Sequence, residues 1–359
     1  MNKLLRLAVL ASTGLAGLSL AGSALAAYAP KLSVSTAGQD TTIRLQIAPT
    51  DDPTFKVTIY APVGVRALLS QPTGTTIGQI GEGSLVQAAD LGNANIPISG
   101  TVKTDDPAKP EYNTSPCAPG RHQAIWLLQL SAAGSSLAPV PMYVDATSGA
   151  ETAFGSTKLQ VCLPPPDVPP GTPGRATFGV RVTDVRFTVS NIFSTAAGTS
   201  GELRWTAVFT PYTPGVGRPN AAGSVQAQAI VRSNAALTLR ARLLTTSRKV
   251  RGKRVISRSV RLTGSVPGAS GARVTLLAGG RSIGQVTTDG SGSFSRTVRI
   301  TRTTSYQARV SAPAGDVTPP TCTASIPGVA TCVSVTTGAL SARSAVVRVV
   351  VPKAKRRGR

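Results

Sequence analysis

Short runs in which hydrophobic and polar residues alternate recur along the chain after residue 30. Residues 237–243 read Leu-Thr-Leu-Arg-Ala-Arg-Leu, and residues 294–300 read Phe-Ser-Arg-Thr-Val-Arg-Ile. A period of two places every second side chain on the same face, which is the pattern of a strand with one buried face. Turns that contain glycine, such as Asp289-Gly290-Ser291-Gly292, separate the runs, and no long helical period follows the first segment. The pattern predicts an all-β protein of two β-sandwich-type domains.

The last third of the chain has the clearest set of predicted strands. They cover residues 237–243, 260–266, 274–277, 283–288, 294–300, 305–310 and 344–351. Seven short strands joined by glycine-bearing turns are what a two-sheet sandwich requires. We therefore predict a basic sandwich domain over 233–352, followed by a basic tail over 353–359.

This predicted domain resembles the bacterial Ig-like domains that are appended to many exported proteins. The residues that carry the resemblance are L-T-G-S-V (262–266), V-T-L-L (274–277), V-T-T-D-G-S-G-S-F (286–294) and T-T-S-Y-Q-A-R-V (303–310). The resemblance implies an Ig-like sandwich that serves spacing or adhesion, and it implies no particular ligand. Two departures from the family are a longer, basic link at 247–257 and a long loop at 313–338.

Residues 27–232 contain a less regular series of predicted strands. The runs are 32–34, 42–47, 55–60, 96–102, 124–130, 140–144, 159–163, 180–189 and 203–209. Residues 163–174 include six prolines and are predicted to be extended. We interpret them as a connector inside one β-rich domain, because residues 177–230 are too few to form an independent hydrophobic core. Residues 210–228 resemble a stretch of uncharacterised exported actinobacterial proteins, and this resemblance implies no function.

The first 26 residues have the three parts of a secretory signal peptide. Lys3 and Arg6 precede an apolar run over 7–20, and Ala24-Leu25-Ala26 is a small-x-small cleavage site. The apolar run is shorter than the roughly 20 residues that span a bilayer, and no cysteine stands at the cleavage site for a lipid anchor. We expect a mature chain that starts near Ala27, has no transmembrane segment, and is extracellular or associated with the cell envelope.

The chain has four cysteines, Cys117, Cys162, Cys322 and Cys332. In an oxidising compartment an even number predicts disulfides, and four cysteines allow three pairings. We predict Cys117–Cys162 and Cys322–Cys332, because each pair then lies within one predicted domain. A zinc site is the alternative, but the chain has no C-x-x-C and its one histidine is His122. We therefore expect neither a metal nor another cofactor.

Positive charge is concentrated in the second part of the chain, within a net charge of +23. Residues 27–232 hold 14 Lys and Arg against 13 Asp and Glu, whereas residues 233–359 hold 22 against 2. An arginine bias from a GC-rich coding sequence would act on both parts, so the asymmetry favours a polyanionic partner. The predicted polyanion-binding residues are Arg248, Lys249, Arg251, Lys253, Arg254, Arg258, Arg261, Lys353, Lys355, Arg356, Arg357 and Arg359.

The polyanions outside a bacterium are envelope polymers, acidic polysaccharide, anionic lipid head groups and extracellular DNA. An anionic envelope polymer or an acidic polysaccharide is the partner that we expect. Nucleic acid is the weakest candidate, because base stacking needs exposed aromatic side chains and the basic part contains only Phe294 and Tyr306.

The sequence lacks the motifs of common catalytic sites. A Ser-His-Asp system would have to use His122, and there is no GxSxG elbow, HExxH, P-loop or GxGxxG. Asp51-Asp52 and Asp105-Asp106 each lie in Thr-Asp-Asp-Pro, where adjacent side chains on an extended chain point apart and form no glycosidase dyad. Aspartate beside proline is typical of a turn, with a calcium site as the alternative. We predict that the protein is not an enzyme.

Two functions are consistent with these features. The first is a secreted, non-catalytic envelope or matrix protein that its basic domain holds to an anionic polymer. The second is a carbohydrate- or protein-binding module in 27–232, with the Ig-like domain as a spacer. Trp126 and Trp205 would offer a sugar platform if they were exposed, but their positions in the pattern predict core residues. An aromatic content of 4% also counts against a sugar-stacking site.

Overall fold

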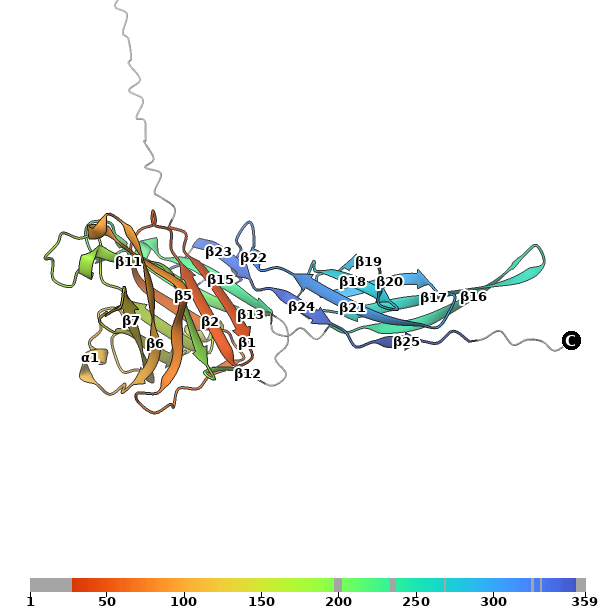
Figure 1. Ribbon diagram of the computed structural model, residues 1–359, viewed down its shortest axis with the longest axis horizontal. Coiled ribbons are helices and arrows are strands. Elements are labelled where there is room, and N and C mark those ends of the chain that lie inside the picture. Colours follow the sequence, from red (N-terminus) through yellow and green to blue (C-terminus); the bar gives the residue numbers. More distant parts are fainter. Residues whose placement is uncertain are drawn as a thin grey trace, which may run out of the picture.

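The computed structural model describes residues 28–196, 202–232, 237–267, 269–323, 326–329 and 331–352 (Figure 1). In these residues strands form nearly all of the regular structure, which confirms the all-β prediction. The helices within these ranges are α1 (Pro110–Asn113) and four short 3-10 helices, Ala89–Leu91, Gly149–Ala153, Thr177–Gly179 and Ala221–Gly223. The predicted signal peptide and the tail cations Lys353, Lys355, Arg356, Arg357 and Arg359 lie outside the described residues.

One large sheet builds the first domain. Its strands, in order across the sheet, are β1 (Lys31–Ala37), β2 (Asp40–Gln46), β11 (Val180–Ser190), β5 (Thr76–Ala88), β6 (Ala94–Asp105), β7 (Ala124–Ala132), β9 (Val140–Ala146), β10 (Thr157–Cys162), β3 (Thr54–Ala61), β13 (Glu202–Thr213), β15 (Val225–Arg232), β23 (Thr331–Thr337) and β22 (Gly315–Asp316). β8 (Ser135–Ser136) adds to β7, and β14 (Arg218–Pro219) adds to β13. β4 (Val65–Ala67) and β12 (Phe193–Thr195) form a separate small sheet.

The large sheet folds over on itself, so that β1 at one edge lies against β15 and β23 near the other. Its inner face encloses the core of the first domain. Trp126 and Trp205 lie in this core with 0% and 1% of their surface exposed, which confirms them as core residues. The ring of Phe193 lies between them, at centroid distances of 6.2 Å from Trp126 and 5.1 Å from Trp205. Neither indole is therefore available as a sugar platform.

Strand β23 corrects the predicted domain organisation. The sequence predicts a loop of the C-terminal domain over 313–338, but β22 and β23 belong to the sheet of the first domain. β23 runs parallel to β15, with Val225 opposite Thr331 and Ile230 opposite Thr337. The backbone groups at the edge of β15 need hydrogen-bond partners, and a strand from much later in the chain supplies them. A pattern that is read locally does not indicate such a pairing.

The proline-rich segment 163–174 connects β10 to β11, which belong to the same sheet. It packs against the first domain rather than leading away from it. Val168 is buried, and the backbone N–H of Gly215 donates to Asp167 Oδ2 at 2.6 Å. At its start, the Tyr212 hydroxyl donates to the carbonyl of Leu163 at 2.7 Å.

The C-terminal body consists of two sheets with a common core. One sheet contains β16 (Arg240–Val250), β17 (Lys253–Ser265) and β20 (Ser293–Arg299). The other contains β19 (Arg281–Thr287), β18 (Arg273–Ala278), β21 (Thr304–Ala312) and β24 (Leu340–Arg343), with β25 (Val347–Val349) paired to β21. Val260 and Leu262 from the first sheet and Val274 and Leu276 from the second are all 0% exposed. The body is a β-sandwich, and its last strand is shorter than the predicted run 344–351.

Candidate polyanion-binding surface

A long hairpin of β16 and β17 carries the basic cluster that the sequence singled out. The two strands pair without interruption from Arg240 opposite Thr263 to Val250 opposite Lys253. Arg251 and Gly252 form the two-residue turn, with φ angles of 48° and 74°. Two positive φ angles are those of a type I′ turn, whose twist matches that of the flanking strands. Residues 247–257, expected to be an inserted link, are therefore continuous strands and a tight turn.

The outer half of this hairpin extends beyond the sandwich. The third strand, β20, pairs only with Ser259–Ser265 of β17, so among the described residues no further strand of this sheet lies beside the hairpin beyond Ser259. Figure 1 shows the paired strands projecting from the end of the sandwich that is remote from the first domain. The basic residues near the turn are accordingly exposed.

The alternation of the strands distributes the predicted cations over two faces. Residues that lie opposite each other share a face, and Val260 and Leu262 identify the face that continues into the core. Lys249, Arg254 and Arg258 belong to that inner face, and Arg258 is half-buried at the rim of the core. We define the outer face as the opposite side, whose cations are Arg240, Arg242, Arg248, Lys253, Arg261 and Arg299.

Three cations of the outer face were absent from the predicted set. Arg240 and Arg242 stand two residues apart in the alternating run at 237–243, so the period of two could have placed them on one face. Arg299 joins them only through the pairing of β20 with β17, in which Arg299 lies opposite Ser259. This cross-strand register is a property of the tertiary structure.

Directly opposed cations occur twice in the hairpin. Arg242 lies opposite Arg261 on the outer face, and Lys249 lies opposite Arg254 on the inner face. Like charges at directly opposite positions destabilise an antiparallel pair. No carboxylate relieves them, because the ion pairs among the described residues all join residues of the first domain's sheet and its loops. An external anion placed between the opposed side chains would remove this repulsion.

The two acidic residues of the basic part are already engaged. Asp316 on β22 pairs with Lys31 of the first domain at 2.6 Å. Asp289 accepts hydrogen bonds from the hydroxyl of Ser291 at 2.6 Å and from the backbone N–H of Ser293 at 2.9 Å. The hydrogen bond from Ser291 and those from the backbone hold the pKa of Asp289 below its usual value. Neither carboxylate forms an ion pair with a cation of the hairpin among the described residues, although Asp289 lines a pocket together with Arg240 and Thr263.

Hydroxyl groups orient two of the arginines. Arg254 Nε donates to Ser247 Oγ at 2.8 Å, and Arg261 Nε donates to Ser295 Oγ at 3.4 Å. Between described residues these are the only hydrogen bonds of the two side chains. The terminal nitrogens of both guanidinium groups are thus available for a bidentate contact with a carboxylate or a phosphate.

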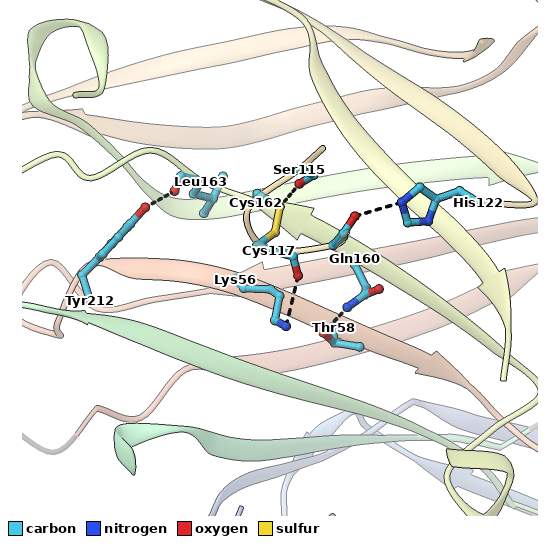
Figure 2. The surroundings of a disulfide bond; sticks show 10 residues. Lys56, Thr58, Ser115, Cys117, His122, Gln160, Cys162, Leu163 and Tyr212 are labelled. Atoms are coloured by element: carbon cyan, nitrogen blue, oxygen red, sulfur yellow. Dashed lines mark hydrogen bonds between the residues drawn. A yellow bond between two sulfur atoms is a disulfide. The ribbon is translucent and has the colours of Figure 1, made fainter. Parts of the chain in front are cut away.

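A disulfide fixes a loop on the outside of the first domain's sheet. Cys117 and Cys162 are bonded, as are Cys322 and Cys332, so both predicted pairings are confirmed. Figure 2 shows Cys117 in the loop and Cys162 on β10, with Lys56 Nζ donating to Cys117 O at 3.3 Å. Burial and the neighbouring Lys158 lower the pKa of Lys56. The second pair lies in the segment that rejoins the first domain, where Thr323 N donates to Gln228 Oε1 at 3.3 Å.

His122 is built into the same loop (Figure 2). Its side chain is 4% exposed, with Nδ1 at 2.9 Å from Asp145 Oδ2 and Nε2 at 3.0 Å from Ala118 O. Both ring nitrogens are occupied, and the ring packs on Tyr143 at 4.6 Å between centroids. This arrangement gives His122 a structural role in holding the loop.

The paired aspartates stabilise turns. Asp51 is buried and accepts from the backbone N–H of Ala48, and Asp106 accepts from the backbone N–H of Ala108 at 2.9 Å. Asp105 is held by Lys109 and by the Tyr112 hydroxyl. Within the described ranges, no three His, Cys, Asp or Glu side chains gather in a group that could hold a metal ion.

No protein-family model matches this chain, and no curated protein matches it significantly. In the part of the chain that the structure describes, no helix is both long enough and apolar enough to span a bilayer.

Proposed function

We propose that this protein is an exported, non-catalytic component of the cell envelope or extracellular matrix, which its basic sandwich holds to an anionic polymer. The observation that carries the proposal is the outer face, where arginines stand in rows without carboxylate partners among the described residues. On this proposal the C-terminal body is an appended, Ig-like domain, and the first domain is displayed away from the polymer.

The spacing of the outer face suits a polymer with a regularly repeated charge. Arg240 and Arg242 are two residues apart, which separates side chains on one face by roughly 6.7 Å along the strand. Arg261 and Arg299 add positions on the neighbouring strands, which are about 4.8 Å apart. Thr263, Ser259 and Thr297 lie between them and can donate hydrogen bonds to hydroxyl or acidic groups of a polysaccharide.

The aromatic residues support a polymer without bases. Phe294 and Tyr306 are 5% and 3% exposed, so neither ring is available to stack on a nucleobase. The expected partner is therefore an acidic polysaccharide or a related envelope polymer, bound through its charges and hydroxyl groups.

Binding of the mature chain to polygalacturonate, with neutral dextran as the reference, tests the proposal. The variant Arg242→Gln, Arg261→Gln, Arg299→Gln should bind at least tenfold more weakly than the wild type, with a shallower dependence on salt because fewer counterions are exchanged. The matched control is Arg66→Gln, Arg121→Gln, Arg218→Gln, which removes the same charge from exposed positions of the first domain.

The control should bind as the wild type does. Equal weakening of both variants would mean that net charge, and not this face, drives the binding. Binding that is absent in the wild type, or insensitive to salt, would refute the attachment to an acidic polymer and direct attention to the first domain.

A further inference from the structure

Exposed aliphatic side chains stand among the cations at the end of the hairpin. We define the hairpin tip as residues 247–256. Within it Val250, Val255 and Ile256 are 38%, 42% and 51% exposed. Val250 and Val255 are diagonal neighbours on the outer face, and Ile256 belongs to the inner face. Contact with a hydrophilic polymer gives these three side chains no role, since threonine has the same branching and suits a solvated strand equally well.

The tip has the reach to pass through a lipid head-group layer. From Ser259, where the pairing with β20 ends, the strand continues for six residues to Lys253. Six residues of strand extend roughly 20 Å. The head-group layer on one side of a bilayer is about 5–8 Å thick, so the tip can meet the acyl boundary while the sandwich remains in water.

Five cations surround the aliphatic side chains. Arg248, Lys249, Arg251, Lys253 and Arg254 all belong to the tip and are exposed. Each lysine or arginine near an anionic membrane surface raises the partition coefficient roughly fivefold. Aliphatic side chains next to cations on an exposed element are the combination that binds the interface of an anionic bilayer.

We propose that the hairpin tip is a membrane-docking finger for bilayers that are rich in anionic lipid. Val250, Val255 and Ile256 reach the acyl boundary, and the long side chains of the five cations, including Arg251 at the apex of the turn, extend back to the level of the lipid phosphates. Arg248 and Lys253 are shared with the outer face, but the aliphatic side chains act on lipid alone. The inference therefore does not rest on attachment to a polymer.

Co-sedimentation with vesicles tests the finger. The wild-type mature chain should bind vesicles of equal phosphatidylglycerol and phosphatidylcholine and should not bind pure phosphatidylcholine. The variant Val250→Thr, Val255→Thr, Ile256→Thr keeps every charge and the branching of each side chain. It should bind anionic vesicles about tenfold more weakly and bind polygalacturonate as the wild type does.

The matched control is Val63→Thr, Val216→Thr, Val346→Thr, which changes three exposed valines outside the hairpin and should leave vesicle binding unchanged. A second measurement uses Ile256→Trp, whose indole should be quenched by lipids that carry a doxyl group in the acyl chain. Trp126 and Trp205 are buried and provide a constant background.

Each result separates the two proposals. Vesicle binding that survives the threonine variant, without quenching of the new indole, would mean that charge alone attracts the lipid and would overturn the finger. Wild-type protein that binds polygalacturonate but not anionic vesicles would also overturn it, and would leave attachment to a polymer intact. The opposite pattern would refute the polymer and support the finger.

Discussion

Buried hydroxyl groups hold together the two ends of the first domain's sheet. Ser334 Oγ donates to Pro30 O at 2.9 Å, and Thr336 Oγ1 donates to Leu32 O at 2.7 Å. Both hydroxyl-bearing residues are 8% exposed and stand two apart on β23, and the accepting carbonyls are also two residues apart, at Pro30 just before β1 and at Leu32 within it. They thereby satisfy carbonyls at the edge of β1 that would otherwise be buried without a partner.

Substitution of Thr336 by valine should weaken the contact between β23 and β1. Valine keeps the shape of the side chain but leaves the Leu32 carbonyl without its donor, so we expect a loss of about 1–3 kcal/mol in the free energy of unfolding. Urea unfolding followed by tryptophan fluorescence measures it, since Trp126 and Trp205 both lie in the first domain. Thr245→Val, on the exposed hairpin, is the control and should change this transition by less than about 0.5 kcal/mol.

Alkaline pH should release the contact of Tyr212. Burial and the nearby Asp167 raise the pKa of Tyr212 to about 12. A group whose pKa is higher in the folded than in the unfolded chain stabilises the fold fully below about pH 10, and this contribution is lost as the pH rises toward 12. Tyr212→Phe should therefore cost about 1 kcal/mol at neutral pH, for the hydrogen bond to Leu163, and clearly less near pH 12.

Urea titrations at both pH values give the comparison. A cost of Tyr212→Phe that is equal at neutral pH and near pH 12 would contradict the assignment of this hydrogen bond to the phenol form.

At the scale of elements, the hairpin depends on its turn and the loop of the first domain depends on its disulfide. Gly252 has a φ of 74°, a conformation that is unfavourable for a β-branched residue. Cys117–Cys162 closes a loop of 45 residues, whereas Cys322–Cys332 closes one of 10. Each element is thus held by one local feature that can be changed separately.

Replacement of Gly252 by valine should loosen the hairpin tip and leave the sandwich intact. Because five lysines and arginines occupy the tip, trypsin should cleave there several times faster, while the melting temperature of the C-terminal body changes little. Gly290→Val is the control, because an added Cβ at Gly290 meets nothing within 4 Å and its φ is not in the left-handed region. Equal cleavage rates in the two variants would argue against a structured tip.

Removal of Cys117–Cys162, which closes the longer loop, should lower the free energy of unfolding more than removal of Cys322–Cys332. Without its crosslink the unfolded chain gains conformational entropy. The free energy of unfolding should therefore fall by about 4 kcal/mol in the double variant Cys117→Ser, Cys162→Ser and by about 3 kcal/mol in Cys322→Ser, Cys332→Ser. Urea unfolding monitored at the two tryptophans measures both, because each bridge belongs to the first domain's sheet or its loops. A reversed order would show that local packing outweighs chain entropy.

At the scale of the whole molecule, the two bodies are not consecutive in the chain. The chain leaves the first domain after Arg232, returns to it at Gly315, and leaves it again after Thr337. The first domain therefore consists of 28–196 and 202–232 together with β22 and β23. Strand β15, which carries Ala227, Ala229 and Val231 in the core, depends on β23 for its second edge.

A chain that ends at Arg232 should not form a stable first domain. It lacks β23 and the hydroxyl contacts to β1, so it exposes a long apolar strand edge, and we expect aggregation or incomplete folding in size-exclusion chromatography and circular dichroism. A better deletion variant removes the hairpin tip alone. Thr246 and Ser257 lie opposite each other, so an Asn-Gly turn can join them in place of residues 247–256. A monomeric, cooperatively folded 27–232 would contradict this view of the first domain.

The sequence by itself determined the class of the fold and the asymmetry of charge. It also favoured the correct disulfide pairings, but through a domain boundary that placed Cys322 and Cys332 in the C-terminal domain, whereas the structure places Cys332 in the first domain's sheet. Period-two alternation is a local property of a strand with one buried face, and it was legible in runs such as 237–243. The core positions of Trp126, in Ile-Trp-Leu-Leu, and of Trp205, in Arg-Trp-Thr, were also predicted, because a large aromatic side chain within a strand-like run is most simply a core residue. These features depend on composition and on short-range pattern, which the chain carries before it folds.

Only the tertiary structure decided which strands pair and which cations share a face. β23 joins β15 across a long stretch of chain, and parallel pairing leaves no turn between the strands as a signal. The register of β16, β17 and β20 divides one run of basic residues between two faces and brings Arg299 beside Arg261. Pairing partners are chosen by the free energy of the whole sheet, because each strand edge can in principle accept any other strand.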